Sequence, residues 1–192
     1  MFRGLSDFIV RNKKVIFFWI FAVIVFFLWD FINIVLVDNI GGWFKRGWLF
    51  LNHILLKSHI NVLYYIYNKL YGLSGSVSYR EIHFHGGGGI IVANNCLGLN
   101  LMYYYVMFIL ISPFGRWKNK LLYSIIGVLY IHILNHIRMI LLMWLSINNS
   151  PYLEINHYFI FNTIVYLNIG MMWYLWMRSE KKYEMKNVKN EI

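Results

Sequence analysis

Four long apolar runs limit what this chain can fold into more than any other feature of its sequence. They cover residues 15–37, 97–112, 121–147 and 158–177, and a helix needs roughly 20 such residues to cross a bilayer. Only 14% of the 192 residues are charged, against about 25% in an average soluble domain. The sequence therefore predicts one integral membrane domain over residues 1–192, an all-α polytopic fold with about four transmembrane helices. The first run exceeds the core of a cleaved signal peptide, so we expect the mature protein to keep it.

Basic residues predict the orientation of these helices. They gather in residues 1–14, in the loop after the second run and in residues 178–192, and by the positive-inside rule these segments face the cytoplasm. Residues 38–95 and 148–156 then face outward, so we expect a multi-pass protein of the cytoplasmic (inner) membrane with both termini inside. Topology and contact with anionic lipids explain the net charge of +10, and nucleic acid is not an expected partner.

The first part of the outward segment allows two interpretations. Residues 39–73 mix apolar stretches with charged residues and histidines, a pattern that suits amphipathic helices lying in the membrane interface. The alternative is a helical hairpin that dips into the membrane or crosses it twice. Both interpretations leave the side of Cys96 unchanged, because two crossings restore the original side.

A small β-hairpin is predicted directly before Cys96. Small residues at 74–78 indicate a turn, and the alternation of side chains over residues 79–85 is typical of a strand. The glycines at 86–89 then turn the chain into a second strand at residues 90–93. An extracytoplasmic hairpin therefore leads straight to Cys96.

Cys96 is the only cysteine in the chain, which excludes an internal disulfide. It follows Asn94 and Asn95 and opens the second apolar run. Because asparagine is a favoured N-cap residue, we expect the thiol in the first turn of a transmembrane helix, where the helix dipole and free N–H groups favour the thiolate. That position is typical of a nucleophile.

Two further residues, Arg138 and His157, are expected in the same half of the membrane as this thiol. Arg138 lies inside the third run, about 13 Å from its outward end at about 1.5 Å per residue, and an arginine inside a membrane costs at least about 2.5 to 3.5 kcal/mol and is usually functional. Asn135 lies on nearly the same helical face, and His157 begins the fourth run from the outside. With four crossings, Cys96, Arg138 and His157 all lie in the outward half of the membrane.

Three motifs follow one another through these runs: Cys96-Leu97-Gly98, Asn135-His136-Ile137-Arg138, and His157. Their order and expected topology resemble the exosortase/archaeosortase family of membrane cysteine transpeptidases, and in particular its compact bacterial members. The resemblance covers residues 90–177, with a core of residues 96–177. It implies that Cys96 is the nucleophile, that Arg138 stabilises charge, and that His157 is the acid or base. Three neighbours are candidates for supporting roles: Asn135, Asn95 and Gly98.

The resemblance also implies what such an enzyme acts on. Its substrates are exported proteins with a C-terminal sorting signal, made of a short motif, a transmembrane helix and a basic end. The enzyme removes this anchor on the outer face of the membrane and transfers the protein to an acceptor nucleophile, which the sequence does not identify. The expected partners are these exported proteins and membrane lipids, and no cofactor is expected.

Two interpretations without catalysis stay open. A membrane assembly or scaffold protein would bind anchor helices without cleaving them, and it would not need a reactive Cys96. A small transporter or channel would use Arg138, His132 and His136 as a polar path. Thiol reactivity distinguishes the enzyme from both, because only the enzyme needs an accessible, thiolate-like cysteine.

Histidine pairs and a glycine run suggest other chemistry less strongly. His132 and His136 share one helical face. His83 and His85 share one face of the predicted strand, but neither pair has a third ligand at a defined spacing, so we expect no metal site. The glycines after His85 are similar to an esterase oxyanion loop, but no Gly-x-Ser-x-Gly motif accompanies them. Asp30 is the only acid within a predicted span, and its partner stays open.

Overall fold

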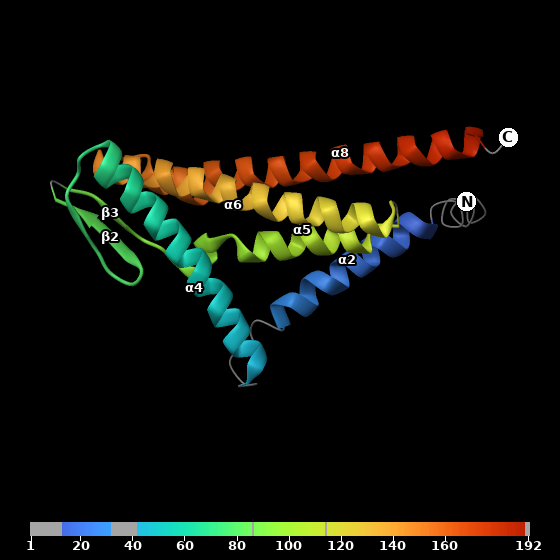
Figure 1. Ribbon diagram of the computed structural model, residues 1–192, viewed down its shortest axis with the longest axis horizontal. Coiled ribbons are helices and arrows are strands. Elements are labelled where there is room, and N and C mark those ends of the chain that lie inside the picture. The colour runs from blue at the N-terminus through green and yellow to red at the C-terminus, as the bar shows by residue number, and fades with distance from the viewer. Residues whose placement is uncertain (1–12, 32–41, 86, 114, 191–192) are drawn as a thin grey trace, which may run out of the picture.

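The computed structural model describes residues 13–31, 42–85, 87–113 and 115–190, most of which are helical (Figure 1). Its α-helices are α2 (Lys13–Phe31), α4 (Trp43–Tyr64), α5 (Leu99–Ile111), α6 (Trp117–Ile147), α7 (Leu153–Ile155) and α8 (Phe161–Asn190). The shorter elements are the π-helices η2 (Tyr65–Leu70) and η4 (Asn156–Ile160), the 3-10 helix η3 (Asn94–Leu97), and the strands β1 (Gly75–Val77), β2 (Glu81–Phe84) and β3 (Gly89–Ile91).

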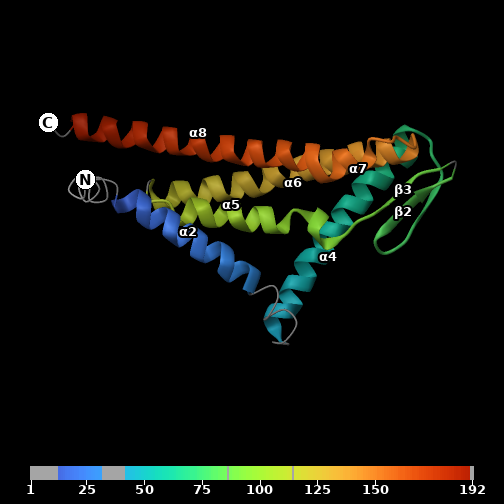
Figure 2. The same cartoon turned by 180° about the vertical axis from the view of Figure 1, so that it is seen from behind.

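Three helices, α5, α6 and α8, run side by side along the long axis of the molecule (Figures 1 and 2). Helix α2 crosses α5 obliquely, and Trp29 stacks there on Tyr103 with ring centroids 3.7 Å apart. Helix α4 runs diagonally towards the sheet. The start of α2 and the end of α8 lie at one end of the molecule, and the sheet lies at the other (Figure 1).

Two helical stretches are long and apolar enough to cross a membrane: Trp117–Ile147 and Leu153–Glu180. Within their most apolar windows, only 33% and 11% of the residues are buried inside the described chain. The core helix of a soluble protein would be mostly buried. The exposed apolar surface of these two helices is therefore consistent with a lipid environment.

The other two predicted crossings are not confirmed. Helix α5 has 13 residues and rises about 20 Å, less than the hydrocarbon thickness of about 30 Å. The second apolar run is itself only 16 residues long, and its first two residues, Leu97 and Gly98, lie outside α5. In the first run, α2 has 19 residues, but residues 32–37 and the side chain of Asp30 lie outside what the structure describes. The four-span topology stays a prediction.

Helices α4 and η2 follow one another without a break through most of residues 39–73. The helical hairpin considered for this segment is therefore wrong, and an interfacial position stays a prediction. Polar residues do not interrupt the helix because its buried apolar side chains form one stripe at helical spacing. The stripe consists of Leu56, Ile60, Leu63 and Tyr67.

The three strands form an antiparallel sheet in the order β1, β2, β3. The predicted hairpin of β2 and β3 is confirmed, and His83 pairs with Gly89 across the glycine turn. The turn predicted at residues 74–78 is wrong, because β1 lies there and pairs with the other edge of β2. Small residues are needed for close packing instead: a Cβ on Gly75 would lie 2.5 Å from the carbonyl oxygen of His83.

Apolar side chains form two cores along α6. The first joins α4, β2 and the segment around Cys96 to the C-terminal half of α6. The second joins α5, α6 and α8. In the second core, the ring of Tyr105 occupies the space that a side chain at Gly127 would need, so this glycine allows α5 and α6 to approach each other closely.

Candidate active site

Cys96 lies in a 3-10 turn, and the prediction that it sits in the first turn of a transmembrane helix is wrong. Gly98 follows this turn with a φ of 75°, and α5 begins only at Leu99. Ala93 is the N-cap residue of the turn, and no side chain caps it, so the predicted asparagine cap is also wrong. The left-handed glycine separates Cys96 from α5. The thiol therefore depends on neighbouring side chains for its reactivity.

Asn135 fixes the Cys96 turn from the side of α6. It is only 3% exposed, and its Nδ2 donates a hydrogen bond of 2.6 Å to the carbonyl oxygen of Cys96. Gly98 allows this approach, because a Cβ there would lie 3.1 Å from Asn135 Nδ2. The structure thus places two of the expected supporting residues, Asn135 and Gly98, next to Cys96. The side chain of the third, Asn95, lies outside what the structure describes.

His157 is an ionisable residue that meets the thiol. Its Nε2 lies 3.6 Å from the Sγ of Cys96, within hydrogen-bonding distance for sulfur. His157 belongs to the π-helix η4, directly before α8, and short π-helical segments are frequent at functional sites. The two side chains are 61 positions apart in the sequence, and they have the geometry of a nucleophile with its base.

Arg138 also lies at this site, where its side chain forms a hydrogen bond with the backbone of His157. It is 8% exposed, and its Nη2 donates a hydrogen bond of 3.3 Å to the carbonyl oxygen of His157. Its Nε is buried and has no hydrogen-bond partner among the described residues. Arg138 is not among the residues that line the adjoining pocket. It therefore positions His157, and its Nε–H is not engaged by any of the described residues.

An open pocket of about 340 Å³ gives access to the thiol and the imidazole. Cys96, His157 and the exposed Glu154 line it. The rest of its wall is mostly apolar and includes Ile90, Ile91, Leu142, Leu153 and Tyr158. Pockets of this size and composition bind small ligands, so the pocket has room for a few side chains of a peptide.

Ser146, near the end of α6, holds the sheet against this pocket. Its Oγ donates a hydrogen bond of 2.7 Å to the carbonyl oxygen of Gly89 and accepts one of 3.0 Å from the N–H of Gly89. Gly88 packs on the same helix end, where a Cβ would lie 2.5 Å from the Cα of Ile147. Sequence analysis missed Ser146, because a serine at the end of an apolar run gives no signal for a partner 57 positions away.

A cluster of three histidines lies next to Asn135, which contacts one of them, His59, through its side-chain amide. His59 of α4 meets His132 and His136 of α6, and one ring nitrogen of each lies within 4.8 Å of the others. Sequence analysis expected no metal site because a third ligand was missing, and that reason is wrong. Burial, followed by the nearby imidazoles of His136 and His132, lowers the pKa of His59 to about 3, and the carbonyl group of Leu97 weakly opposes this shift.

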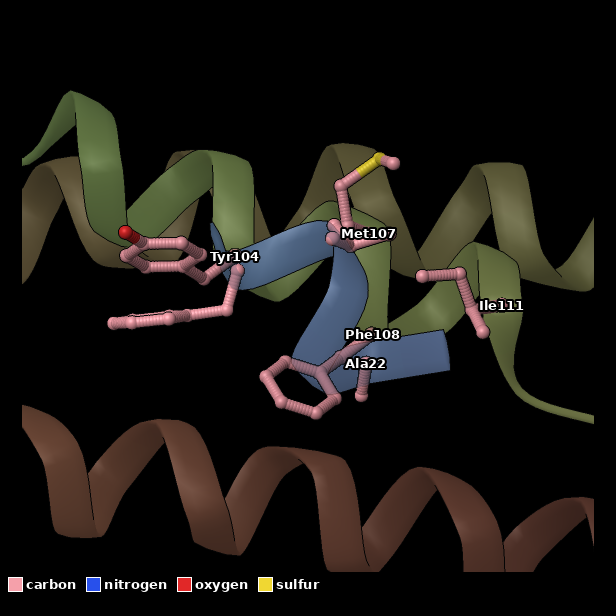
Figure 3. Close-up of a pocket in the computed structure, with 7 residues that line it drawn as sticks. Ala22, Tyr104, Met107, Phe108 and Ile111 are labelled. Atoms are coloured by element: carbon pink, nitrogen blue, oxygen red, sulfur yellow. The ribbon is translucent and has the colours of Figure 1, made fainter. Parts of the chain in front are cut away.

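A second hollow, between α2 and α5, offers no comparable chemistry (Figure 3). Its volume is about 10 Å³, close to the space of one water molecule. Its lining is apolar and aromatic and includes Ala22, Tyr104, Met107, Phe108 and Ile111. This crevice results from helix packing and is not part of the candidate site.

Side chains from distant parts of the sequence meet around Cys96. The structure brings together Cys96, Arg138 and His157, which come from three separate segments, and it places two of them in the wall of one pocket. Comparison of the chain with known protein families, curated proteins and solved structures found no match.

Proposed function

We propose that this chain is a membrane-embedded cysteine transpeptidase or protease similar to the exosortases. It cleaves C-terminal sorting signals from exported proteins on the outer face of the cytoplasmic membrane and transfers those proteins to an acceptor. The observation that carries the proposal is the distance of 3.6 Å between Cys96 Sγ and His157 Nε2 in the wall of an open pocket. A thiol beside an imidazole in an accessible pocket is the arrangement of a nucleophile with its general base.

The first half of the reaction forms a thioester. His157 Nε2 takes the proton of the Cys96 thiol, and the thiolate attacks the carbonyl carbon of the scissile peptide bond. The π electrons of the carbonyl group move to its oxygen and give a tetrahedral oxyanion. As the C–N bond breaks, His157 passes its proton to the leaving amine, which carries the membrane anchor. The exported protein stays on Cys96 as a thioester.

The second half releases the protein. An acceptor amine or a water molecule attacks the thioester carbonyl carbon while His157 takes a proton from it. The C–S bond breaks, and the proton returns to the Cys96 sulfur. An amine gives transfer, and water gives hydrolysis. Glu154 lines the same pocket, where its side-chain oxygens are placed to accept a hydrogen bond from the N–H of an amine acceptor.

The oxyanion needs hydrogen-bond donors that are not already engaged. The backbone N–H of Cys96 is engaged, because it donates to the carbonyl oxygen of Ala93 at 2.9 Å. The Nε of Arg138 is buried without a partner among the described residues, while Nη2 is fixed on the carbonyl oxygen of His157. We therefore assign stabilisation of the oxyanion to Arg138, whose positive charge acts from behind the pocket wall because Arg138 does not line the pocket.

The membrane context supports this assignment of substrate. Arg138 and His157 belong to the two stretches that are long and apolar enough to cross a bilayer. With both chain ends in the cytoplasm, the pocket faces outward. The apolar side chains that α6 and α8 expose, such as Leu141 and Ile164, then offer a surface on which the anchor helix of a substrate packs beside the thiol.

Removal of the nucleophile tests the proposal. Membrane proteins from cells that carry the wild-type or the Cys96→Ala chain are compared by mass spectrometry for retained C-terminal anchors. We expect a defined set of proteins to keep their anchors only with Cys96→Ala. The matched control is His85→Ala, which changes an exposed histidine that does not line the pocket and should leave processing intact. Normal processing by a stably inserted Cys96→Ala chain would reject the enzyme and favour a scaffold that binds anchor helices without cleaving them.

A further inference from the structure

Three histidines that the proposed reaction does not use meet between α4 and α6. His59 comes from α4, and His132 and His136 lie one turn apart on α6. The ring centroids are 4.2 Å apart for His59 and His136, 4.3 Å for His132 and His136, and 5.2 Å for His59 and His132. One ring nitrogen of each lies within 4.8 Å of the others. Such a convergence of imidazoles from two helices is a ligand set for a metal ion.

The histidines have fewer hydrogen-bond partners than their burial requires. His59 is fully buried, and the Nδ1 atoms of His59 and His132 have no partner among the described residues. The Nε2 atoms of His132 and His136 both face one hydroxyl group, Ser58 Oγ, at 3.3 Å each. A hydroxyl group has a single proton to donate, so it cannot donate to both rings. The described residues therefore do not satisfy these rings, and a bound metal ion would provide a partner for one nitrogen of each ring.

The surroundings already orient one of the rings for a metal ion. The Nδ1 of His136 lies 2.9 Å from the carbonyl oxygen of His132, so Nδ1 carries the proton and Nε2 keeps its lone pair. Metal-binding histidines are commonly fixed in this way through their second ring nitrogen. Asn135 is different, because its Nδ2 donates to the lone pair of His59 Nε2 at 3.3 Å, so His59 must give up this contact when it binds a metal ion through Nε2.

The donor set selects the class of metal. The cluster contains three imidazoles and no carboxylate or thiolate. Imidazole ligands suit Zn²⁺ and neighbouring first-row divalent ions, whereas Mg²⁺ and Ca²⁺ prefer oxygen. Tetrahedral zinc with bonds of about 2.1 Å sets its ligands about 3.4 Å apart, so the rings move closer when the ion binds. A water molecule or the hydroxyl group of Ser58 takes the fourth position.

We propose that His59, His132 and His136 bind one divalent transition-metal ion, with Zn²⁺ as the best match. The ion links α4 to α6. Asn135 Nδ2 donates to His59 and also to the carbonyl oxygen of Cys96 at 2.6 Å, so a metal ion on His59 Nε2 leaves this donor to the cysteine turn alone. The metal is structural, and its binding does not require the proposed transpeptidase activity, because Cys96 is not one of its ligands.

Metal analysis of the purified full chain tests this site. The chain is purified in detergent with an affinity tag that contains no histidine, and its metals are measured by inductively coupled plasma mass spectrometry. After chelation, Co²⁺ is added as a probe, because tetrahedral Co²⁺ absorbs visible light. We expect about one ion per wild-type chain and a Co²⁺ spectrum. In His136→Ala and His132→Gln, Co²⁺ affinity should fall by about tenfold or more, in line with the loss of one ligand.

Two controls separate metal loss from misfolding and from lost catalysis. His85→Ala and Cys96→Ala should both bind Co²⁺ like the wild type. Zn²⁺ should raise the Tm of the chelated wild type but not that of His136→Ala or His132→Gln, each of which must still unfold cooperatively. If the chelated wild type binds no more Co²⁺ than these two variants, or if Zn²⁺ leaves its Tm unchanged, the metal site is rejected, whatever the outcome for anchor processing.

Discussion

Replacement of Gly98 by alanine probes the geometry of the Cys96 turn without changing the thiol. Gly98 has a φ of 75°, a left-handed conformation that alanine adopts at a cost. Its new Cβ would lie 3.1 Å from Asn135 Nδ2 and 3.4 Å from Asn135 Cγ. Asn135 must then move away from the Cys96 carbonyl oxygen, to which it donates at 2.6 Å. The substitution therefore strains the turn and weakens the hydrogen bond that fixes it.

The expected loss combines two terms. A residue other than glycine in the left-handed region costs about 1 to 2 kcal/mol, and the weakened hydrogen bond adds about 0.5 to 1.5 kcal/mol. We therefore expect Gly98→Ala to lower the free energy of unfolding by about 1.5 to 3.5 kcal/mol. If the turn relaxes locally, the same free energy reduces the fraction of chains in which Cys96 faces His157, and anchor processing falls by about tenfold or more.

Denaturant unfolding in detergent and anchor processing in cells measure both consequences. Gly170→Ala is the matched control, because Gly170 lies within α8 and has nothing within 4 Å of its Cβ position. Alanine in a helix is favoured over glycine by about 0.5 to 1 kcal/mol, so this control should be neutral or slightly stabilising. If Gly98→Ala matches Gly170→Ala in stability and in processing, the geometry assigned to the Cys96 turn is wrong.

Three further substitutions test other contacts. Ser146→Ala removes both hydrogen bonds to Gly89 and should lower the free energy of unfolding by about 1 to 3 kcal/mol; unchanged denaturant unfolding would contradict this contact. Tyr67→Phe removes the 2.7 Å hydrogen bond to the carbonyl oxygen of Ile140 and should cost about 0.5 to 1.5 kcal/mol, measured in the same way. Arg138→Gln keeps a hydrogen-bond donor but removes the charge, so processing should fall by about 100-fold or more; wild-type processing would exclude a role in stabilising the oxyanion.

Features set by local patterns could be predicted from the sequence. Side-chain alternation and a glycine turn predict the hairpin of β2 and β3, because both signals lie within a few residues of each other. The apolar run from residue 121 to residue 147 predicts most of α6 for the same reason. The order of the motifs pointed to Cys96, Arg138 and His157, which lie together in the structure, and their catalytic roles stay predictions.

Features that depend on competing signals or distant contacts could not be predicted. Asparagines before Cys96 favour a helix cap, but the left-handed Gly98 ends the 3-10 turn first. His59 joins His132 only because α4 packs on α6, and nothing near it in the sequence indicates this partner. Strand β1 resembles a turn in sequence, because the need for a small residue at Gly75 comes from its packing against β2.

Alkylation kinetics test the pairing of Cys96 with His157 most directly. Cys96 is the only cysteine, so the mass gained from a small neutral alkylating reagent reports on this thiol alone. Because the imidazole lies 3.6 Å from Sγ and is placed to take the thiol proton during the attack on the reagent, we predict that Cys96 at pH 7 reacts about tenfold or more faster in the folded wild type than in folded His157→Gln. The two chains should react equally after unfolding. Equal rates in the two folded chains would contradict the proposed nucleophile and base.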